Sequence, residues 1–410
     1  MVMKKVYSIL LIVSISLLMV KCQKDIDPQN SAISVNSGNE DQKCVYVYPS
    51  SDNGVIVLWL SNEGISKKLL ITKFNEDGNS EWTNTIPNNS DFFSVSSLKD
   101  GGILMVVNSL TPKLIKLDKN GSVVFNKAIA SPPKNSFTNP IEGENKHIYI
   151  TINKEASWWA DTTALLEFDE NGERITEKTI KIYDNSFLSK NGRTGFIYLN
   201  MLFKVDQNQN FYFYGAKYPG FSLQDLFQNP NLYVAQFKYD NTTLIDKKTV
   251  ILDPDNLYSK NEGGTLNHVI TPDNNLLISS IQVEPNNNYK GHLVMVDMNF
   301  EVIWKKDISF GLGYTFVNSL SNCPDGNFLI CGDCRVSGKG DNQPFAAKIS
   351  KTGEILWHKI YTTNLYGRFT NGVQTNNGTI FLGGNSTAFG RGLNSQDFLF
   401  VRTAKDGVLK

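Results

Sequence analysis

The stretch Ala347-Lys-Ile-Ser-Lys-Thr-Gly-Glu-Ile-Leu-Trp357 decides the fold of this chain. Apolar residues stand on both sides of a Thr-Gly pair, which predicts two antiparallel strands joined by a tight turn. The unit recurs seven times, and in four of the first six copies an aromatic residue stands four positions after the turn centre (Trp82, Phe125, Trp304 and Trp357). The turn centres are Gly78, Gly121, Gly172, Thr242, Phe300, Gly353 and Gly407.

A second hairpin precedes each of these units. Its turns fall at residues 52–54, 100–102, 144–146, 207–209, 273–275, 325–326 and 376–378. Each repeat therefore holds four strands, and the repeats average about 55 residues. This pattern predicts an all-β chain, a seven-bladed β-propeller of four-stranded antiparallel blades. A β-sandwich also has short strands with regular turns, but it does not explain why one hairpin recurs seven times in order.

The recurring aromatic residue is expected to pack between blades. A four-stranded sheet has two faces and buries both only by stacking against its neighbours. The repeat resembles the quinoprotein-like propeller repeats of secreted bacterial proteins, in which an Ala, a later Thr-Gly and a Trp recur as they do in residues 347–357. The resemblance covers about residues 42–410 and implies architecture only, because the chain has no cluster that matches a quinone site.

The N-terminus has the pattern of a secretion signal. Lys4 and Lys5 precede the uncharged run 6–20, which is too short for a membrane-spanning helix of about 20 residues and suits a signal peptide. Cys22 follows directly, and its position resembles the acylated cysteine of a bacterial lipobox, although Lys21 stands where that motif has a small residue. A cleaved secretory protein with an incidental cysteine is the alternative.

The segment after Cys22 resembles the export signal of Bacteroidota-type surface lipoproteins, with Gln23, Lys24, Asp25 and Asp27 as the matching residues. The resemblance implies an outer-membrane protein, lipid-anchored and exposed at the cell surface. The expected organisation is a signal peptide at 1–21, the lipidated cysteine and a tether at 22–41, and the propeller at 42–410.

Composition narrows the classes of function. The chain has 410 residues with 40 Lys plus Arg and 40 Asp plus Glu, a balance that argues against a nucleic-acid partner. Removal of residues 1–21 takes away three lysines and leaves a formal charge of −3. A soluble body of this mild acidity suits an anionic cell surface.

The candidate binding surface is the face that carries the long loops. The turns within hairpins are uniformly tight, whereas the connections at the other end of the blades vary widely in length, and function concentrates on such loops. Adjacent Trp158 and Trp159 are the leading residues, because exposed tryptophan favours sugars and protein partners. The whole candidate set is Trp158, Trp159, Tyr218, Phe221, Phe227, Tyr289, Tyr366, Arg368 and Arg391.

No catalytic motif stands out. The four histidines, His147, His268, His292 and His358, share no metal-ligand spacing, and neither a nucleophile elbow nor a phosphate-binding loop is present. Cys331 and Cys334 have the C-x-x-C spacing but lack further ligands for zinc, so buried thiols or one local disulfide are expected. We therefore predict no catalytic residue, no metal and no cofactor.

The sequence favours a binding or scaffolding module, an accessory subunit of an outer-membrane uptake or export complex. Expected partners are membrane lipid through Cys22, an outer-membrane protein and a glycan. The alternative is an extracellular polysaccharide hydrolase or lyase with its site on the loop-rich face, so enzymatic activity stays open. A further prediction concerns ring closure: residues 31–36, in which Ile33 and Val35 alternate with polar neighbours, would add the outermost strand of the seventh blade.

Overall fold

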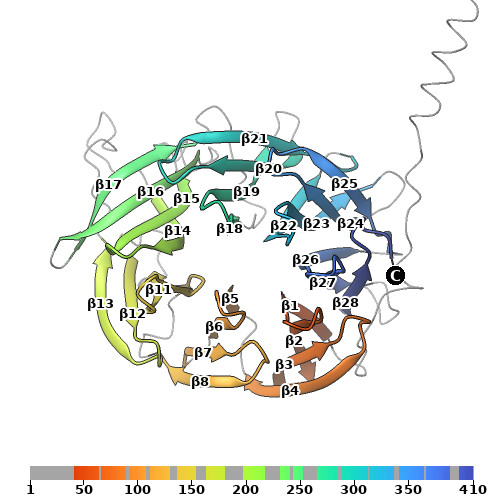
Figure 1. Cartoon of the computed structure of the whole chain (residues 1–410), viewed down its shortest axis with the longest axis horizontal. Coiled ribbons are helices and arrows are strands. Elements are labelled where there is room, and N and C mark those ends of the chain that lie inside the picture. The colour runs from red at the N-terminus through yellow and green to blue at the C-terminus, as the bar shows by residue number, and fades with distance from the viewer. Residues whose placement is uncertain are drawn as a thin grey trace, which may run out of the picture.

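The computed structural model describes residues 41–409 apart from 64–65, 89–92, 108–110, 130–135, 154–162, 181–196, 218–230, 241–242, 253–265, 284–287, 313, 337–340, 364–365 and 388–396. Every regular element in this part of the chain is a β-strand. Figure 1 shows the strands grouped into seven blades that form a ring around one axis. The predicted all-β, seven-bladed propeller is confirmed.

In blades 1 to 4 the strands follow each other from the axis outward in chain order, each antiparallel to the next (Figure 1). The first strand of blade 3 is split into two short pieces, β9 and β10, which both pair with β11. The strands are β1 (Asp41–Pro49), β2 (Val55–Glu63), β3 (Ser66–Phe74), β4 (Ser80–Asn88), β5 (Phe93–Ser97), β6 (Ile103–Val107), β7 (Lys113–Leu117), β8 (Val123–Ala128), β9 (Ser136–Phe137), β10 (Ile141–Glu142), β11 (Ile148–Asn153), β12 (Thr163–Phe168), β13 (Arg174–Ile180), β14 (Ile197–Val205), β15 (Asn210–Lys217), β16 (Asn231–Asp240) and β17 (Thr243–Ile251).

Blades 5 and 6 repeat this order, and blade 7 departs from it at its outer edge. The strands are β18 (Asn267–Ile270), β19 (Leu276–Val283), β20 (Tyr289–Val296), β21 (Val302–Ile308), β22 (Thr315–Asn322), β23 (Phe328–Arg335), β24 (Asn342–Ile349), β25 (Ile355–Ile360), β26 (Gly367–Gln374), β27 (Ile380–Ser386) and β28 (Asp397–Thr403). Among the described residues, the fourth strand of blade 7 is reduced to one antiparallel bridge between Thr403 and Leu409. Residues 31–36, the predicted closing strand, lie outside the described residues.

The tight turns follow the predicted chemistry. Turn centres of both hairpins have positive φ, for example 84° at Gly353 and 63° at Asn53. Glycine reaches this region without strain, and asparagine tolerates it better than most residues. Phe300 occupies the same place with φ of 66°, which the repeat alignment predicts despite its side chain. Thr242, the remaining turn centre, lies outside the described residues.

The core is divided among the seams between blades. The buried apolar residues form seven clusters, and each cluster belongs to one pair of adjacent blades. In the seam between blades 5 and 6, for example, Leu293 of β20 packs in one cluster with Ile330 of β23. Each sheet therefore buries both of its faces against neighbours, as the repeat pattern requires.

The recurring aromatic residue and the recurring turn glycine form one contact. Trp304 of blade 5 lies over Gly353 of blade 6, and a Cβ atom there would stand 2.9 Å from its Cε3. The indole of Trp304 also donates a hydrogen bond of 2.9 Å to the carbonyl of Lys351. Trp357 repeats both contacts on blade 7, where it donates 3.0 Å to the carbonyl of Lys405. The predicted role of the aromatic residue between blades is confirmed.

Two seams depart from this rule. At the seam between blades 4 and 5 the aromatic ring comes from the turn: Phe300 is buried, and Lys248 of blade 4 donates 2.6 Å to the carbonyl of Asn299. At the seam between blades 3 and 4, β13 pairs in parallel with β17 through Thr179 and Thr243. The repeat pattern did not predict this pairing, because it joins residues of two different repeats.

Among the described residues, the structure has no helix that is long and apolar enough to cross a membrane. Residues 1–40, which hold the expected signal peptide, Cys22 and the export-signal residues, lie outside the described part of the chain.

Candidate functional site

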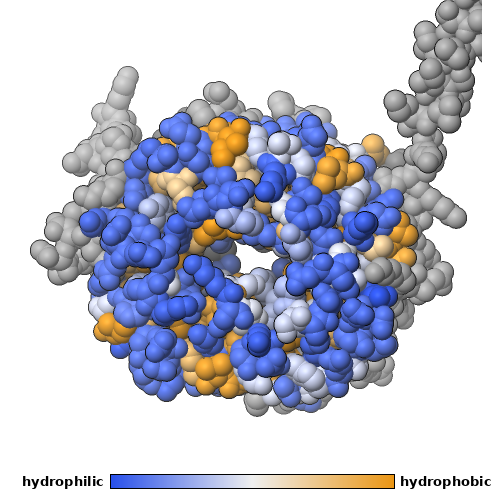
Figure 2. Space-filling model, in the orientation of Figure 1, coloured by the Kyte–Doolittle hydropathy of each residue, from blue (hydrophilic) through white to orange (hydrophobic). Residues whose placement is uncertain are grey.

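The first strands of the blades surround an axial cavity of about 1200 Å³. These strands are the innermost in Figure 1, and Figure 2 shows the hollow at the centre of the ring. All seven blades contribute to the wall, which runs from the beginning of the first strands to the tight turns. One residue from each blade illustrates this: Tyr46, Ser96, Asn139, Phe203, His268, Ser319 and Asn371.

β-bulges aim side chains into the cavity from three consecutive blades. The register of β1, β22 and β26 shifts by one residue at the same place, around Val45, Asn318 and Thr370. A bulge leaves one residue without a cross-strand partner and turns its side chain away from the regular alternation. All three extra residues line the cavity.

Polar side chains of the cavity also tie neighbouring blades together. Hydroxyls and amides on one first strand donate to backbone carbonyls on the next, as in Ser321 Oγ to Gly372 O at 2.8 Å and Asn318 Nδ2 to Phe369 O at 3.0 Å. Comparable bonds run from Ser94 to Phe137, from Asn267 to Val317, from Asn322 to Ile270 and from Thr370 to Cys44. These bonds satisfy backbone groups that the innermost strands would otherwise present to the axis.

Asn371 links three blades at once. Its Oδ1 accepts a bond of 3.1 Å from the backbone amide of Val47 in blade 1, and its Nδ2 donates 3.3 Å to Ser319 Oγ in blade 6. In the wall formed by blades 6, 7 and 1, many polar side chains are thus already hydrogen-bonded to neighbouring blades. We call this part the laced wall, defined by Asn318, Ser319, Ser321, Thr370 and Asn371.

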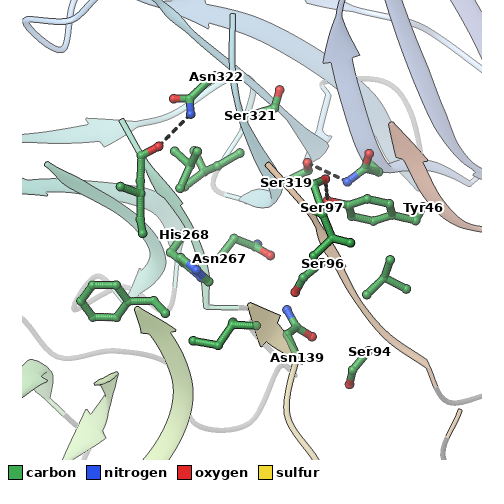
Figure 3. Close-up of a pocket in the computed structure, with 18 of the residues that line it drawn as sticks. Tyr46, Ser94, Ser96, Ser97, Asn139, Asn267, His268, Ser319, Ser321 and Asn322 are labelled. Carbon is green, nitrogen blue, oxygen red and sulfur yellow. Dashed lines mark hydrogen bonds between the residues drawn. The ribbon is translucent and has the colours of Figure 1, made fainter. Parts of the chain in front are cut away.

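The opposite side of the cavity leaves polar atoms available. Ser96 of β5 and Asn139, which lies between β9 and β10, face the cavity in Figure 3, and the described residues give neither side chain a hydrogen-bond partner. Phe137 stands two residues before Asn139 and is half-buried. We call Ser96, Phe137 and Asn139 the open wall.

His268 stands between Tyr214 and Phe203 in the wall. Its Nδ1 lies 2.9 Å from the hydroxyl of Tyr214, which also donates to the carbonyl of Leu266. Burial lowers the pKa of His268 to about 4, because the charged imidazolium would lose its hydration there. The ring is therefore neutral at physiological pH.

Charged residues are confined to the turn end of the cavity and balance each other. Lys99, Glu142, Glu144 and Lys204 are the charged lining residues, two of each sign. Lys204 pairs with Glu144 at 3.7 Å, and Glu142 pairs with Lys116 at 3.6 Å. The cavity thus offers hydroxyls, amides, aromatic edges and aliphatic side chains, with equal numbers of acidic and basic residues at its turn end.

The structure separates the described members of the predicted binding face into two groups. Tyr289 packs against Tyr314 with ring centroids 5.1 Å apart and stacks on Phe316, and the guanidinium of Arg335 extends this group at the seam between blades 5 and 6. Trp158, Trp159, Tyr218, Phe221, Phe227 and Arg391 lie outside the described residues. Their placement on the loop-rich face stays a prediction.

Tyr366 and Arg368 form the second group, beside a buried carboxyl. Burial raises the pKa of Asp333, which accepts 2.7 Å bonds from Asn318 and Asn342, while nearby Arg368 acts in the opposite direction. Burial also raises the pKa of Tyr366. Asp333 carried no signal in the sequence, because a single aspartate near the end of an apolar strand is not distinguishable from a solvated one.

Sequence reasoning also missed the axial cavity itself. The available signal was the composition of the first strands, where short polar residues stand at many of the positions that line the axis, as in Ser94, Ser96, Asn318 and Ser319. The spacing of the four histidines gives no sign that His268 lines the axis.

The cysteines serve packing. Cys44, Cys323, Cys331 and Cys334 are free, buried thiols, and burial raises the pKa of Cys323 and of Cys334 to about 12. The expectation of buried thiols, rather than a disulfide, is thus met. Gly383, which the repeat aligns with Cys331, leaves room for the Cys44 sulfur, so this is a position where small residues are required.

Neither a protein-family model nor a curated protein matches the sequence. Solved structures share the fold. The polysaccharide lyase Uly1 is 11% identical, with a TM-score of 0.50 over 88% of this chain and 90% of that one. A protein of unknown function from Bacteroides caccae is 16% identical, with a TM-score of 0.40 over 78% of this chain and 94% of that one. The β-propeller domain of the Trilobed protease from Pyrococcus furiosus is 10% identical, with a TM-score of 0.47 over 89% and 98%. At these identities the likeness extends to the propeller fold alone.

Proposed function

We propose that this protein is a ligand-binding module displayed on the outer surface of a bacterial cell, with the axial cavity as its binding site. The observation that carries the proposal is the lining of hydroxyl and amide groups that all seven blades contribute. Concave sites with a few convergent polar groups on a rigid scaffold are the usual form of a ligand site.

The anchor in this proposal is Cys22, acylated after removal of residues 1–21, with Gln23, Lys24, Asp25 and Asp27 as the export signal. β1 begins at Asp41, at the end of the blade opposite the tight turns, so the tether would join the loop-rich face. Cys22→Ala should release the protein from membranes after a salt wash. Retention of the variant on the membrane would contradict the lipid anchor but would not bear on the proposed binding site in the axial cavity.

A protein partner in the same membrane is the second part of the proposal, with this chain as an accessory subunit of an uptake or export complex. The outer strands expose aliphatic residues near their turn ends, such as Val124 of β8, Ile303 of β21 and Leu356 of β25. Figure 2 shows apolar patches spaced around the rim of the ring. Exposed aliphatic patches of this kind favour contact with another protein.

Affinity capture from gently solubilised outer membrane tests this part. Wild type should retain an integral barrel protein, and the triple variant Val124→Ser, Ile303→Ser, Leu356→Ser should lose it. The control is Thr85→Ala, a change at an exposed position of β4. Its neighbour Ile86 is buried, so a change to Ser there would disturb the core and is not suitable. Capture of nothing but monomer by wild type would contradict the accessory role.

A second candidate function is hydrolysis or elimination on a polysaccharide at the loop-rich face. It is favoured by Asp333, whose raised pKa suits a carboxyl that keeps its proton for general acid catalysis, beside Tyr366 and Arg368. Release of reducing ends or unsaturated products by wild type but not by Asp333→Asn would establish it. Equal absence of product from both proteins would leave binding as the function.

A further inference from the structure

The lining of the axial cavity carries information about its ligand. A charged ligand needs an opposite charge that is not already paired. Among the four charged lining residues, Lys204 pairs with Glu144 and Glu142 pairs with Lys116, which leaves the exposed Lys99 as the charged group without an ion pair among the described residues. His268 is half-buried, and its lowered pKa of about 4 leaves the ring neutral. A polycation would lose its hydration in this cavity without gaining an ion pair. A phosphate or a uronate would find one unpaired lysine, Lys99, which is exposed to solvent and therefore contributes little attraction.

The bonds between blades argue against an extended peptide. A peptide that binds by strand addition uses the backbone donors and acceptors of an open strand edge. Around this axis, neighbouring side chains already occupy the carbonyls of Phe137, Val317, Phe369, Gly372 and Ile270. What the cavity presents instead is a set of side-chain hydroxyls and amides.

The open wall has the chemistry of a hydroxyl-binding site. Ser96 and Asn139 can each donate and accept, which matches a ligand whose hydroxyls also do both. Phe137 adds an apolar face beside them, and Tyr46 lies in the wall of blade 1, where its hydroxyl is 3.0 Å from Ser97 Oγ (Figure 3). Rings of this kind supply contact area with little loss of conformational entropy.

From these observations, and resting on the proposed function, we infer that the axial cavity binds an uncharged, hydroxyl-rich ligand of the oligosaccharide class, read by Ser96 and Asn139 of the open wall. The laced wall of blades 6, 7 and 1 holds the shape of the cavity, and the open wall selects the ligand. A neutral oligosaccharide satisfies both groups of the open wall and needs no counter-charge.

The experiment uses the full-length lipoprotein in detergent and an array of neutral glycans, oligogalacturonates and a neutral Ser/Asn/Gly heptapeptide. Positive probes are then titrated by calorimetry against wild type, Ser96→Ala, Asn139→Ala and the double variant. Each single change should weaken the binding of a neutral oligosaccharide about 3- to 10-fold, the loss expected for one hydrogen bond. Ser80→Ala and Asn84→Ala, the same changes on the exposed outer strand β4, should leave the dissociation constant unchanged. Unaltered melting temperatures exclude misfolding as the cause.

Each other outcome overturns the inference in a recognisable way. Preference for oligogalacturonate or for the peptide would show that the ligand class is wrong while a binding function stands. Neutral binding that the double variant does not weaken would place the site elsewhere, for example on the loop-rich face. Absence of all glycan binding, with a membrane protein still captured, would leave the proposed binding module intact and remove the oligosaccharide.

Discussion

The seam between blades 6 and 7 and the seam between blades 7 and 1 both join adjacent blades, but they do so through different contacts. At the first, Trp357 covers Gly407 and donates to Lys405, and the hydroxyl of Tyr361 donates 2.9 Å to the carbonyl of Gly407. At the second, Phe400 packs on Phe74 with ring centroids 4.6 Å apart. Arg402 of the same strand donates 2.7 Å to the carbonyl of Glu76.

The difference follows from chain connectivity. Blades 6 and 7 are neighbours in sequence, so their seam forms between segments already held close. Blades 7 and 1 join residues more than 300 positions apart, as in the bond from Asn377 to Asn53, and their contact must offset the entropy of closing that loop. Both seams have side-chain bonds to the backbone, and the closing seam adds a cluster of three phenylalanine rings, Phe74, Phe381 and Phe400.

The largest expected effect comes from Phe400→Ala at the closing seam. Removing a fully buried phenylalanine costs about 3–5 kcal/mol, here with loss of contacts to Phe74 and Phe381. Denaturant unfolding should show that loss, and hydrogen exchange should accelerate in β1 and β28 first. Phe345→Ala, equally buried at the seam between blades 5 and 6, is the matched control. Early exchange of β1 in the control as well would contradict a special role for the closing seam.

A pair of glycine substitutions should give the next largest effect. Gly353→Ala combines the strain of positive φ with a Cβ atom 2.9 Å from the Trp304 ring, whereas Gly378→Ala has similar φ and meets only the Cβ of Lys405 at 3.4 Å. Positive φ costs about 1–2 kcal/mol for a residue with a Cβ atom, and overpacking adds about 1–3 kcal/mol. Thermal unfolding should therefore find Gly353→Ala clearly the less stable. Equal losses would mean that the tryptophan does not define the seam.

Arg402→Ala should have a moderate effect on the closing seam. The side chain loses its bond to the Glu76 carbonyl and a 3.3 Å ion pair with the exposed Asp77, together about 1 kcal/mol. The ion-pair part should fade in high salt, because exposed charges are screened. Lys127→Ala, which removes an exposed pair with Glu173 and no backbone bond, should cost less. A larger loss in the control would rule out the backbone contact as the main contribution.

The smallest effect concerns pH. Burial raises the pKa of Asp52, but hydrogen bonds from Lys73 and Ser50 outweigh it and hold the pKa at about 2. The carboxyl titrates near 3.9 in an unfolded chain, at about the usual value. Its contribution to stability is therefore complete above about pH 4 and is lost as the pH falls toward 2.

Asp52→Asn should consequently lower the melting temperature at pH 7, and its effect should be much smaller near pH 2, where much of the folded-state carboxyl is protonated. Asp325→Asn in blade 6 is the matched variant, since Lys348 bonds to Asp325 as Lys73 does to Asp52. Each lysine keeps a second partner, Glu81 at 3.3 Å for Lys73 and Gln374 at 2.9 Å for Lys348, so the two variants should lose a similar amount of stability. A difference for Asp52→Asn that persists undiminished at pH 2 would mean that the ionised carboxyl is not the stabilising form.

Much of this architecture was predictable because it is repeated. Turn centres, strand order and the seam role of Trp304 and Trp357 follow from a pattern that recurs along the chain. Single events were not predictable: the parallel pairing of Thr179 with Thr243, the role of Lys248 beside Phe300, and the aromatic contact of Phe74 with Phe400 each occur once. The candidate site was harder still, because Ser96 and Asn139 belong to different blades, line one cavity only after those blades have packed, and share no local motif.

The division of the core into seven separate clusters has a consequence for how such a molecule changes over generations. Each cluster is formed by two adjacent blades only. A duplicated or deleted repeat of about 55 residues therefore has to fit the two flanking blades rather than one shared core. Gain or loss of a blade would change the width of the axial cavity and thus the size of the ligand that it admits. The packing between the remaining neighbours would change little, so that the number of blades sets the size of the ligand while each seam keeps its own contacts.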